Sequence, residues 1–438
     1  MNFIARSSLV GEITCPNCWE RFPPERVLYV SSHPEQYGDL RLGDQALRRF
    51  LPSQFHPDGR AIDPKGGLCH QTACPRCHLF VPRVLLENPT LFVSMFGSPS
   101  SGKSYLLAAI THRLRSVLPK EFALNFSDPY PEANAILHAY EDKLFAGNGK
   151  QQLVSLDKTG ETGNWYNEVN FGAQTLSYPK PFFFQISPVE GHPNSARPAS
   201  VSRTLCFYDN AGESFQPGAD RSDNSVTQHM AKSGCLIFVF DPTQDVRFRR
   251  LLSGISADQQ VMADRVERQD LILSETARRV KTYSGISMTA FHDRPLIVLV
   301  NKFDAWQKLV GDKRLSDPWV CHPSKKFSVL KIETILQVSE KLRQLLQTHS
   351  PSIVATAESF VDPKKVIYMP ASATGGAPTV MPSGRLAHIS GTLKPMWVET
   401  PLLYVLSKFV PGLVFSKKSK PNTPDDLGLN EVEEEPSA

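Results

Sequence analysis

A short run of glycine, serine and lysine has spacings that suit phosphate binding. Residues 97–104 read Gly-Ser-Pro-Ser-Ser-Gly-Lys-Ser and match the pattern G-x-x-x-x-G-K-[ST] at each fixed position. Glycine lets the backbone curl, so that successive N–H groups face phosphate oxygens. The lysine ammonium is expected to bind the β- and γ-phosphates, and the last serine hydroxyl to bind magnesium. The predicted nucleotide-binding residues of this loop are Gly97, Ser98, Pro99, Ser100, Ser101, Gly102, Lys103 and Ser104.

The residues on either side of this loop predict the elements that position it. Residues 91–96 are an apolar run typical of a buried strand. Residues 104–117 carry apolar side chains at helical spacing, and Pro119 lies beyond the expected helix end. Because a helix N-terminus carries partial positive charge, this helix favours the same anion. The order strand, loop, helix predicts the start of an α/β unit. A flexible loop of small residues could still match by chance, and the loop alone does not distinguish ATP from GTP.

A second motif, D-x-x-G, is formed by Asp209 and Gly212 directly after the apolar run 205–208. A carboxylate at a strand end can hold magnesium through water, and the glycine N–H can contact the γ-phosphate and respond to its loss. Taken alone, the motif is equally typical of a tight turn. Its position downstream of the phosphate loop favours the catalytic interpretation. The next residue, Glu213, could orient the attacking water, slow hydrolysis or simply lie on the surface.

A third motif indicates which base is bound. Asn301, Lys302 and Asp304 form N-K-x-D after the apolar run 296–300. The aspartate can accept hydrogen bonds from N1 and N2 of guanine, and adenine has no donors at those positions. Asn301 is expected to support the phosphate loop and Lys302 to lie across the face of the base. A solvated polar loop is the alternative.

Two remaining parts of a nucleotide site are less specific. Ser372 and Ala373 belong to an S-A-T segment after the apolar run 366–369, where backbone N–H groups could meet guanine O6. A loop of small residues is nearly as good an interpretation. The motif resemblance described below further implies a threonine that ligates magnesium between the phosphate loop and the D-x-x-G motif. The candidates, with the first preferred, are Thr159, Thr162 and Thr175.

Four cysteines form two C-P-x-C pairs, and these are Cys15, Cys18, Cys74 and Cys77. Each pair can present two thiolates from a tight turn, and together they complete a tetrahedral zinc site. No position is left for water, so a structural role is predicted. The 55 residues at positions 19–73 exceed the usual spacing of a zinc ribbon and predict an insertion. Open alternatives are free thiols in unrelated turns, or participation of Cys69, His70 or His78.

The composition of the chain indicates the class of protein and the predicted location in the cell. The chain has 438 residues, 41% hydrophobic and 21% charged, with a net charge of +4. These values are ordinary for a globular protein and give no argument for nucleic acid or an anionic membrane. No apolar run approaches the length of about 18 residues that a transmembrane helix needs. With no signal peptide visible and paired cysteines typical of metal ligands, the predicted location is the cytoplasm.

The order of the motifs GSPSSGKS, DNAG, NKFD and SAT resembles the translation-factor-related (TRAFAC) class of P-loop GTPases. Within that class the chain is similar to the bacterial double-GTPase (DO-GTPase) type, which carries zinc modules. The resemblance covers about residues 90–410 and implies GTP, Mg²⁺ and a Ras-like core of about six strands. Two departures are the wide gaps between motifs, which predict insertions, and Glu213 where Ras-like proteins have glutamine.

The predicted fold is therefore α/β, a Ras-like three-layer sandwich with a mostly parallel central sheet, plus a small N-terminal zinc-ribbon-like module. The expected strands, besides residues 91–96, cover residues 182–186, 205–208, 236–240, 296–300 and 366–369. Helices are expected around residues 246–283, 330–348 and 401–415, and an elaborated loop region at 141–180. The predicted domains are a zinc module at 1–88, a GTPase domain at 89–415 and a disordered tail at 416–438.

The function predicted from these features is hydrolysis of GTP to GDP and phosphate, used as a molecular switch. The residues expected to carry it are Lys103, Ser104, Thr159, Asp209, Gly212 and Glu213. A protein partner that senses the nucleotide state is expected, a second GTPase being one candidate, in a bacterial conflict or other multi-protein system. Two alternatives remain: a non-hydrolysing nucleotide-binding scaffold, and an ATPase that binds nucleic acid through its zinc ribbon.

Overall fold

The computed structural model describes most of the chain. The described residues are 9–147, 152–157, 160, 163–216, 218–219, 228–256, 266–311, 315–321 and 327–417. Most of the predicted tail lies outside them. The exception is Ser416–Lys417, which form strand β24 beside β20 (Ser328–Lys331), so ordered structure continues past the predicted boundary at 415.

Among the described residues, the central sheet has seven strands in the order β11-β15-β16-β10-β17-β18-β21. The strands from β16 to β21 run parallel, whereas β15 pairs antiparallel with both β16 and β11. The sheet is therefore mixed, and it contains every predicted strand together with β11. The bounds are β11 (Leu124–Ser127), β15 (Phe182–Pro188), β16 (Arg203–Tyr208), β10 (Thr90–Gly97), β17 (Cys235–Phe240), β18 (Leu296–Val300) and β21 (Val366–Pro370).

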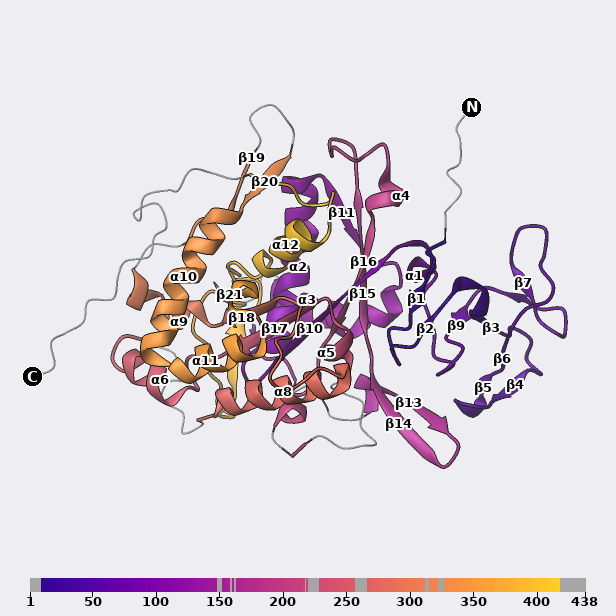
Figure 1. Ribbon diagram of the computed structural model, residues 1–438, viewed down its shortest axis with the longest axis horizontal. Helices are drawn as coiled ribbons and strands as arrows, with labels where there is room; N and C mark the ends of the chain where they lie inside the picture. Colours follow the sequence, from indigo (N-terminus) through magenta and orange to yellow (C-terminus); the bar gives the residue numbers. More distant parts are fainter. Residues whose placement is uncertain are drawn as a thin grey trace, which may run out of the picture.

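Helices cover both faces of this sheet (Figure 1). Alternate residues of β17, β18 and β21 enter two separate hydrophobic clusters; for example, Ile237 and Val239 enter one, and Leu236 and Phe238 the other. Because both faces are buried, the strands are continuous apolar runs. The first cluster includes α2 (Lys103–Phe122), α3 (Ala135–Phe145) and α12 (Thr400–Phe409). The second includes α6 (Val246–Leu252), α8 (Gln269–Ser284), α9 (Phe303–Val310) and α11 (Pro351–Phe360), and α10 (Ile332–His349) contributes to both.

The N-terminal region consists of short strand pairs and lies at one end of the molecule, beyond β15 and β16 (Figure 1). Its cysteines share a hydrophobic cluster with Phe92, Phe183 and Tyr208 of the central sheet. The region is therefore packed onto the sheet. Its elements are β1 (Ile13–Thr14), β2 (Arg21–Phe22), β3 (Leu28–Val30), β4 (Tyr37–Asp39), β5 (Gly43–Leu47), β6 (Arg49–Phe50), β7 (Ala61–Ile62), β8 (Leu68–Cys69), β9 (Thr72–Ala73) and α1 (Val84–Glu87).

Several elements differ from the sequence-based expectation. Helix α2 continues through Pro119 to Phe122 and ends at Ala123, which has a φ of 50°. The proline is tolerated in this last turn because Leu118 and Phe122 are anchored in the core. The expected loop region forms strand β12 (Leu153–Val154) and a hairpin of β13 (Tyr166–Phe171) and β14 (Gln174–Pro179).

The helical segment expected over 246–283 is divided into α6 and α8, and residues 257–265 between them lie outside the described part. None of the helices in the described part of the chain has the length and apolar character needed to cross a lipid bilayer.

Candidate nucleotide-binding site and metal centre

The phosphate loop connects the end of β10 to the start of α2. Gly102 precedes the helix with a φ of 87°, a left-handed conformation that glycine adopts without strain. The Lys103 ammonium folds back over the loop and donates hydrogen bonds to the carbonyl oxygens of Gly97 (3.1 Å) and Ser98 (2.9 Å). This lysine therefore lies inside the curl of the loop, where the predicted phosphate would sit.

The D-x-x-G segment lies directly against the phosphate loop. A Cβ atom built on Gly212 would be 2.4 Å from the backbone nitrogen of Pro99, so only glycine permits this approach. In the same region the Ser104 hydroxyl donates to a carboxylate oxygen of Asp209 at 2.7 Å. The structure thus brings together the two side chains that the sequence predicts as direct and water-mediated magnesium ligands.

The N-K-x-D segment approaches the phosphate loop from the end of β18. The Asn301 amide donates to the carbonyl of Ser101 at 2.8 Å, which is the supporting contact expected from sequence. Lys302 takes a left-handed φ of 53°, and its ammonium is paired with the buried carboxylate of Asp241. This arrangement fixes the turn that leads into α9, where Asp304 lies in the first turn.

The S-A-T segment after β21 contacts the same aspartate. The Ser372 hydroxyl donates a hydrogen bond to the Asp304 carboxylate, and the Gly375 N–H donates to the Ser372 oxygen at 2.8 Å. Ser372 is completely buried. The carboxylate predicted to recognise guanine is therefore held by a side chain from the neighbouring strand end.

These segments surround one cavity with a volume of about 410 Å³. Lys103, Ser104 and Asp304 all belong to its wall. The other predicted site residues in the wall are Pro99, Ser100, Gly102, Gly212, Glu213, Asn301, Lys302, Ser372 and Ala373. Within the described chain, Gly97, Ser98, Ser101 and Asp209 are not in the wall, although they belong to the same loops.

The magnesium-binding threonine stays a prediction. Thr159, the preferred candidate, and Thr162 both lie outside the described residues. Thr175 lies in β14, and its hydroxyl donates to the Asn170 side chain at 2.8 Å. It does not line the cavity in the described part of the chain, which removes the support for this third candidate.

The cavity also has a wall that no motif revealed. Strands β22 (Thr379–Val380) and β23 (Leu386–Ile389) form a hairpin that pairs with β12. Arg385 in this hairpin lies 3.4 Å from the carboxylate of Asp157, and both line the cavity. The backbone N–H of Leu156 donates to the Tyr105 hydroxyl at 2.8 Å. Arg385, Leu156 and Asp157 belong to segments without a recognisable pattern, so their place in the wall could not be predicted from the sequence.

The loop that follows Gly212 is held from the opposite side of the site. Glu213 lines the cavity within a short 3-10 helix, Gly212–Phe215. The buried Arg279 of α8 donates to the carbonyl oxygens of Ser214 (2.7 Å) and Gln216 (2.8 Å). The position of Glu213 is thus fixed by its neighbours in the chain.

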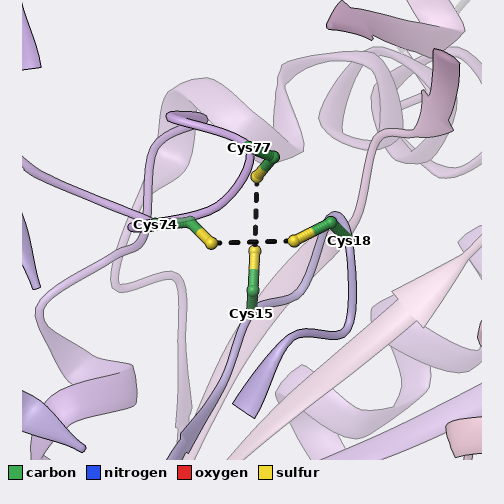
Figure 2. Close-up of side chains that lie close together, drawn as sticks. All are labelled: Cys15, Cys18, Cys74 and Cys77. Carbon is green, nitrogen blue, oxygen red and sulfur yellow. Dashed lines mark hydrogen bonds between the residues drawn. The ribbon is translucent and has the colours of Figure 1, made fainter. Parts of the chain in front are cut away.

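The four predicted zinc-binding cysteines converge although 55 residues, positions 19–73, separate the two pairs. Among the residues that the structure describes, their four sulfur atoms lie within 4.8 Å of one another (Figure 2). The sulfur atoms of Cys15 and Cys77 are 3.7 Å apart, and those of Cys18 and Cys74 are 3.6 Å apart. A tetrahedron with zinc–sulfur bonds of about 2.3 Å has edges of about 3.8 Å, so the spacing fits zinc.

The chemistry of the four thiols also suits a cation. Burial raises the pKa of Cys15 and Cys77, because a thiolate loses its hydration there. A bound divalent cation would supply the opposite charge and hold all four sulfurs as thiolates. The alternative ligands are placed elsewhere: His78 pairs with Asp39 at 2.9 Å, Cys69 donates to the Gly67 carbonyl, and His70 is exposed.

Comparisons with known proteins give only distant similarity. No protein-family model matches the chain. A curated relative is SaeC of Mycolicibacterium smegmatis, whose name proposes it as an ESX-1 scaffolding and assembly protein. It is 23% identical over 266 residues, which are 56% of this chain and 62% of SaeC. The chain therefore spans less than two thirds of the length of that relative.

Among solved structures, the chain is similar to the Ski7 GTPase-like domain of S. cerevisiae bound to GTP, with 13% identity and a TM-score of 0.23. The match covers 65% of this chain and 43% of that one. Sup35 complexed with GDP gives 13% identity and a TM-score of 0.24 over 65% and 38% of the two chains. Scores this low support no argument about function.

Replacing Gly212 with alanine is expected to weaken nucleotide binding by roughly tenfold, equivalent to about 1.4 kcal/mol. The added methyl group would meet the backbone of Pro99, and one of the two loops must move. Fluorescence titration with a labelled guanine nucleotide measures the effect. Gly376→Ala is the matched control, because Gly376 lines the same cavity and a Cβ there meets nothing within 4 Å. Equal affinities for the two variants would contradict the expectation.

Cys74→Ser is expected to abolish retention of about one zinc ion per chain and to lower the free energy of unfolding by more than about 4 kcal/mol. Elemental analysis and thermal unfolding measure the two effects. Cys321→Ser is the control, since Cys321 is exposed. Zinc content that is the same in both variants and the unaltered protein would exclude the cysteine cluster as the metal centre.

Proposed function

We propose that the chain binds GTP with magnesium and hydrolyses it to GDP and phosphate, acting as a molecular switch. One observation carries this proposal: Asp304 lines the same cavity as Lys103 and Ser104. A guanine-recognising carboxylate and a phosphate-binding loop therefore face one space that can hold a single nucleotide. The proposal places the protein with TRAFAC GTPases and retains the double-GTPase type as the narrower assignment.

Recognition of the base would depend on the paired side chains at the two strand ends. Asp304 would accept hydrogen bonds from the N1 and N2 donors of guanine, while the buried Ser372 hydroxyl keeps its carboxylate oriented. Ala373, also in the wall, would present its backbone to guanine O6. With adenine the carboxylate would be left without those donors, which is the physical basis of the proposed selectivity.

At the phosphates, Lys103 would leave its backbone carbonyl partners and bind the β- and γ-phosphates. Ser104 and Asp209 would hold magnesium, directly and through water respectively, with Thr159 as the remaining proposed ligand. The metal ion would neutralise charge that develops on the phosphates. Gly212 would donate its N–H to the γ-phosphate and move when that phosphate leaves, and Glu213 would orient the attacking water.

The cysteine cluster is proposed to hold a structural zinc ion. Its two turns contribute to the hydrophobic cluster that joins the N-terminal region to the central sheet. Residues buried in this way support the fold, and this favours an internal role over direct binding of nucleic acid by the turns. A protein partner is proposed to sense the nucleotide state by binding the GTP-bound and GDP-bound forms differently.

A non-hydrolysing scaffold is the second candidate. The similarity to SaeC, whose name proposes scaffolding and assembly, favours it, as does the carboxylate at Glu213 where glutamine orients water in Ras-like proteins.

Asp304→Asn is expected to reduce affinity for GTP by roughly 100-fold and to raise affinity for xanthosine triphosphate, because an amide donor matches the extra oxygen of xanthine. Competition binding with GTP, ATP and xanthosine triphosphate tests this. Asp157→Asn, which alters another carboxylate of the same cavity, should leave the base preference unchanged. If Asp304→Asn kept its preference for GTP, guanine recognition by this residue would be wrong.

The rate of GTP hydrolysis distinguishes the two candidate functions. Under the switch hypothesis, purified protein releases phosphate from GTP above the level of Lys103→Ala, and Glu213→Ala lowers the rate by roughly tenfold or more with little change in GTP affinity. Release that equals the Lys103→Ala background in the presence of saturating GTP would instead support the scaffold.

A further inference from the structure

The first cysteine turn makes direct hydrogen bonds with the strand that carries the D-x-x-G motif. The Tyr208 hydroxyl donates to the carbonyl oxygen of Pro16 at 2.6 Å. The same hydroxyl accepts a hydrogen bond from the indole N–H of Trp19 at 3.1 Å. Pro16 lies between Cys15 and Cys18, and Trp19 follows Cys18. The hydroxyl of one tyrosine is therefore tied to both ends of the metal-binding turn.

Tyr208 is also the residue immediately before Asp209. It is the last residue of β16, and its side chain is completely buried. Because a strand end held in this way cannot shift without disturbing the hydroxyl contacts, the start of the D-x-x-G loop is anchored to the cysteine turn. The residue itself does not touch the nucleotide cavity in the described structure.

A second residue extends this connection to both phosphate-facing loops. The His229 ring stacks on Tyr208 with centroids 4.4 Å apart and lies 6.2 Å from the Trp19 ring. One ring nitrogen of His229 is hydrogen-bonded to the amide of Asn210, and the other to the Ser94 hydroxyl at 2.5 Å. Asn210 lies inside the D-x-x-G motif, and Ser94 lies in β10, which leads into the phosphate loop.

Every side chain in this series of contacts is buried. The exposed fraction is 6% for Trp19 and 0% for Tyr208, His229, Asn210 and Ser94. Polar atoms that lose their partners in such surroundings cannot recover hydrogen bonds from water, so the groups move together or not at all. A shift of the Asp209–Gly212 loop would therefore strain contacts that reach the cysteine turn, and a change of the turn would strain contacts that reach the loop.

We propose that Tyr208 and His229 are positioning residues that couple the four-cysteine metal centre to the D-x-x-G loop. Binding of the γ-phosphate and retention of the metal are then linked equilibria. If nucleotide alters metal affinity by some factor, metal must alter nucleotide affinity by the same factor. This inference rests on the proposed function, because it requires a loop that responds to the γ-phosphate.

The rate of zinc release measures this linkage without reference to hydrolysis. The zinc-loaded protein of 438 residues is mixed with a chromogenic chelator in three states: nucleotide-free, with GDP, and with a non-hydrolysable GTP analogue. We expect the release rates with GDP and with the analogue to differ by about fivefold or more, the lower range of measured allosteric couplings. Equal rates in these two states, with both nucleotides shown to be bound, would overturn the coupling.

Tyr208→Phe tests whether the hydroxyl contacts of Tyr208 carry the proposed coupling. The variant keeps the ring that stacks on His229 but loses the hydroxyl that contacts Pro16 and Trp19. The variant is expected to bind zinc and nucleotide. The ratio of its zinc-release rates with GDP and with the GTP analogue is expected to fall toward one. Tyr178→Phe is the matched control, because Tyr178 packs on Trp19 with centroids 5.8 Å apart and its hydroxyl makes no hydrogen bond among the described residues. A ratio as large in Tyr208→Phe as in Tyr178→Phe would overturn the proposal.

Two further outcomes separate this inference from the proposed function. If Tyr208→Phe does not fold, Trp19→Phe removes the indole donor from the other side of the same contact and is expected to lower the ratio as well; an unchanged ratio overturns the proposed pathway. If the unaltered protein binds no guanine nucleotide in the fluorescence titration, the proposed function is wrong and the coupling is wrong with it. Binding without any effect on zinc release contradicts the coupling alone.

Discussion

The site depends on one constraint, namely that the carboxyl ends of parallel strands meet at the same edge of a sheet. Strands β10, β16, β18 and β21 each end at a motif, and these ends lie along the same edge of the sheet, with β17 between β10 and β18. The contacts are short and specific: Gly212 against Pro99, and Asn301 on Ser101. No single helix or loop could hold segments that are so far apart in sequence. The sheet is therefore the element on which every proposed contact with a nucleotide depends.

Much of this arrangement could be predicted because it follows from local chemistry. Strands buried on both faces must be continuous apolar runs, as in Leu296–Val300, and such runs are visible in the sequence. The glycines of the phosphate loop and the paired cysteines are restricted by geometry, so their residue types identify them. What could not be predicted comes from contacts without a local pattern. Arg385 enters the cavity from a hairpin with no motif, and the partners of Tyr208 are found in the N-terminal region.

The N-terminal region shares a packed surface with the central sheet. The change in composition near residue 88 predicts a separate module, and no observation tests where its boundary lies. The hydrophobic cluster around the cysteines nevertheless includes Phe183 and Tyr208 from the central sheet. A metal ion in that cluster would stabilise a surface that belongs to both regions. Cysteine spacing predicted the cluster, but only the packed structure reveals what the turns support.

The wall that β12, β22 and β23 add to the cavity is joined to the fold differently from the motif loops. Strand β12 pairs with β23 at two positions, Leu153 with Ile389 and Val154 with His388, and the N–H groups of Ser390 and Gly391 donate to the carbonyl oxygens of Gln152 and Leu144. The exposed pair of Asp157 and Arg385 adds little, because water and salt weaken such contacts. These few contacts are local to the wall, whereas the strands that end at the motifs belong to a sheet of seven described strands. A change in this wall would therefore reshape the cavity while leaving the strand ends that carry the motifs in place.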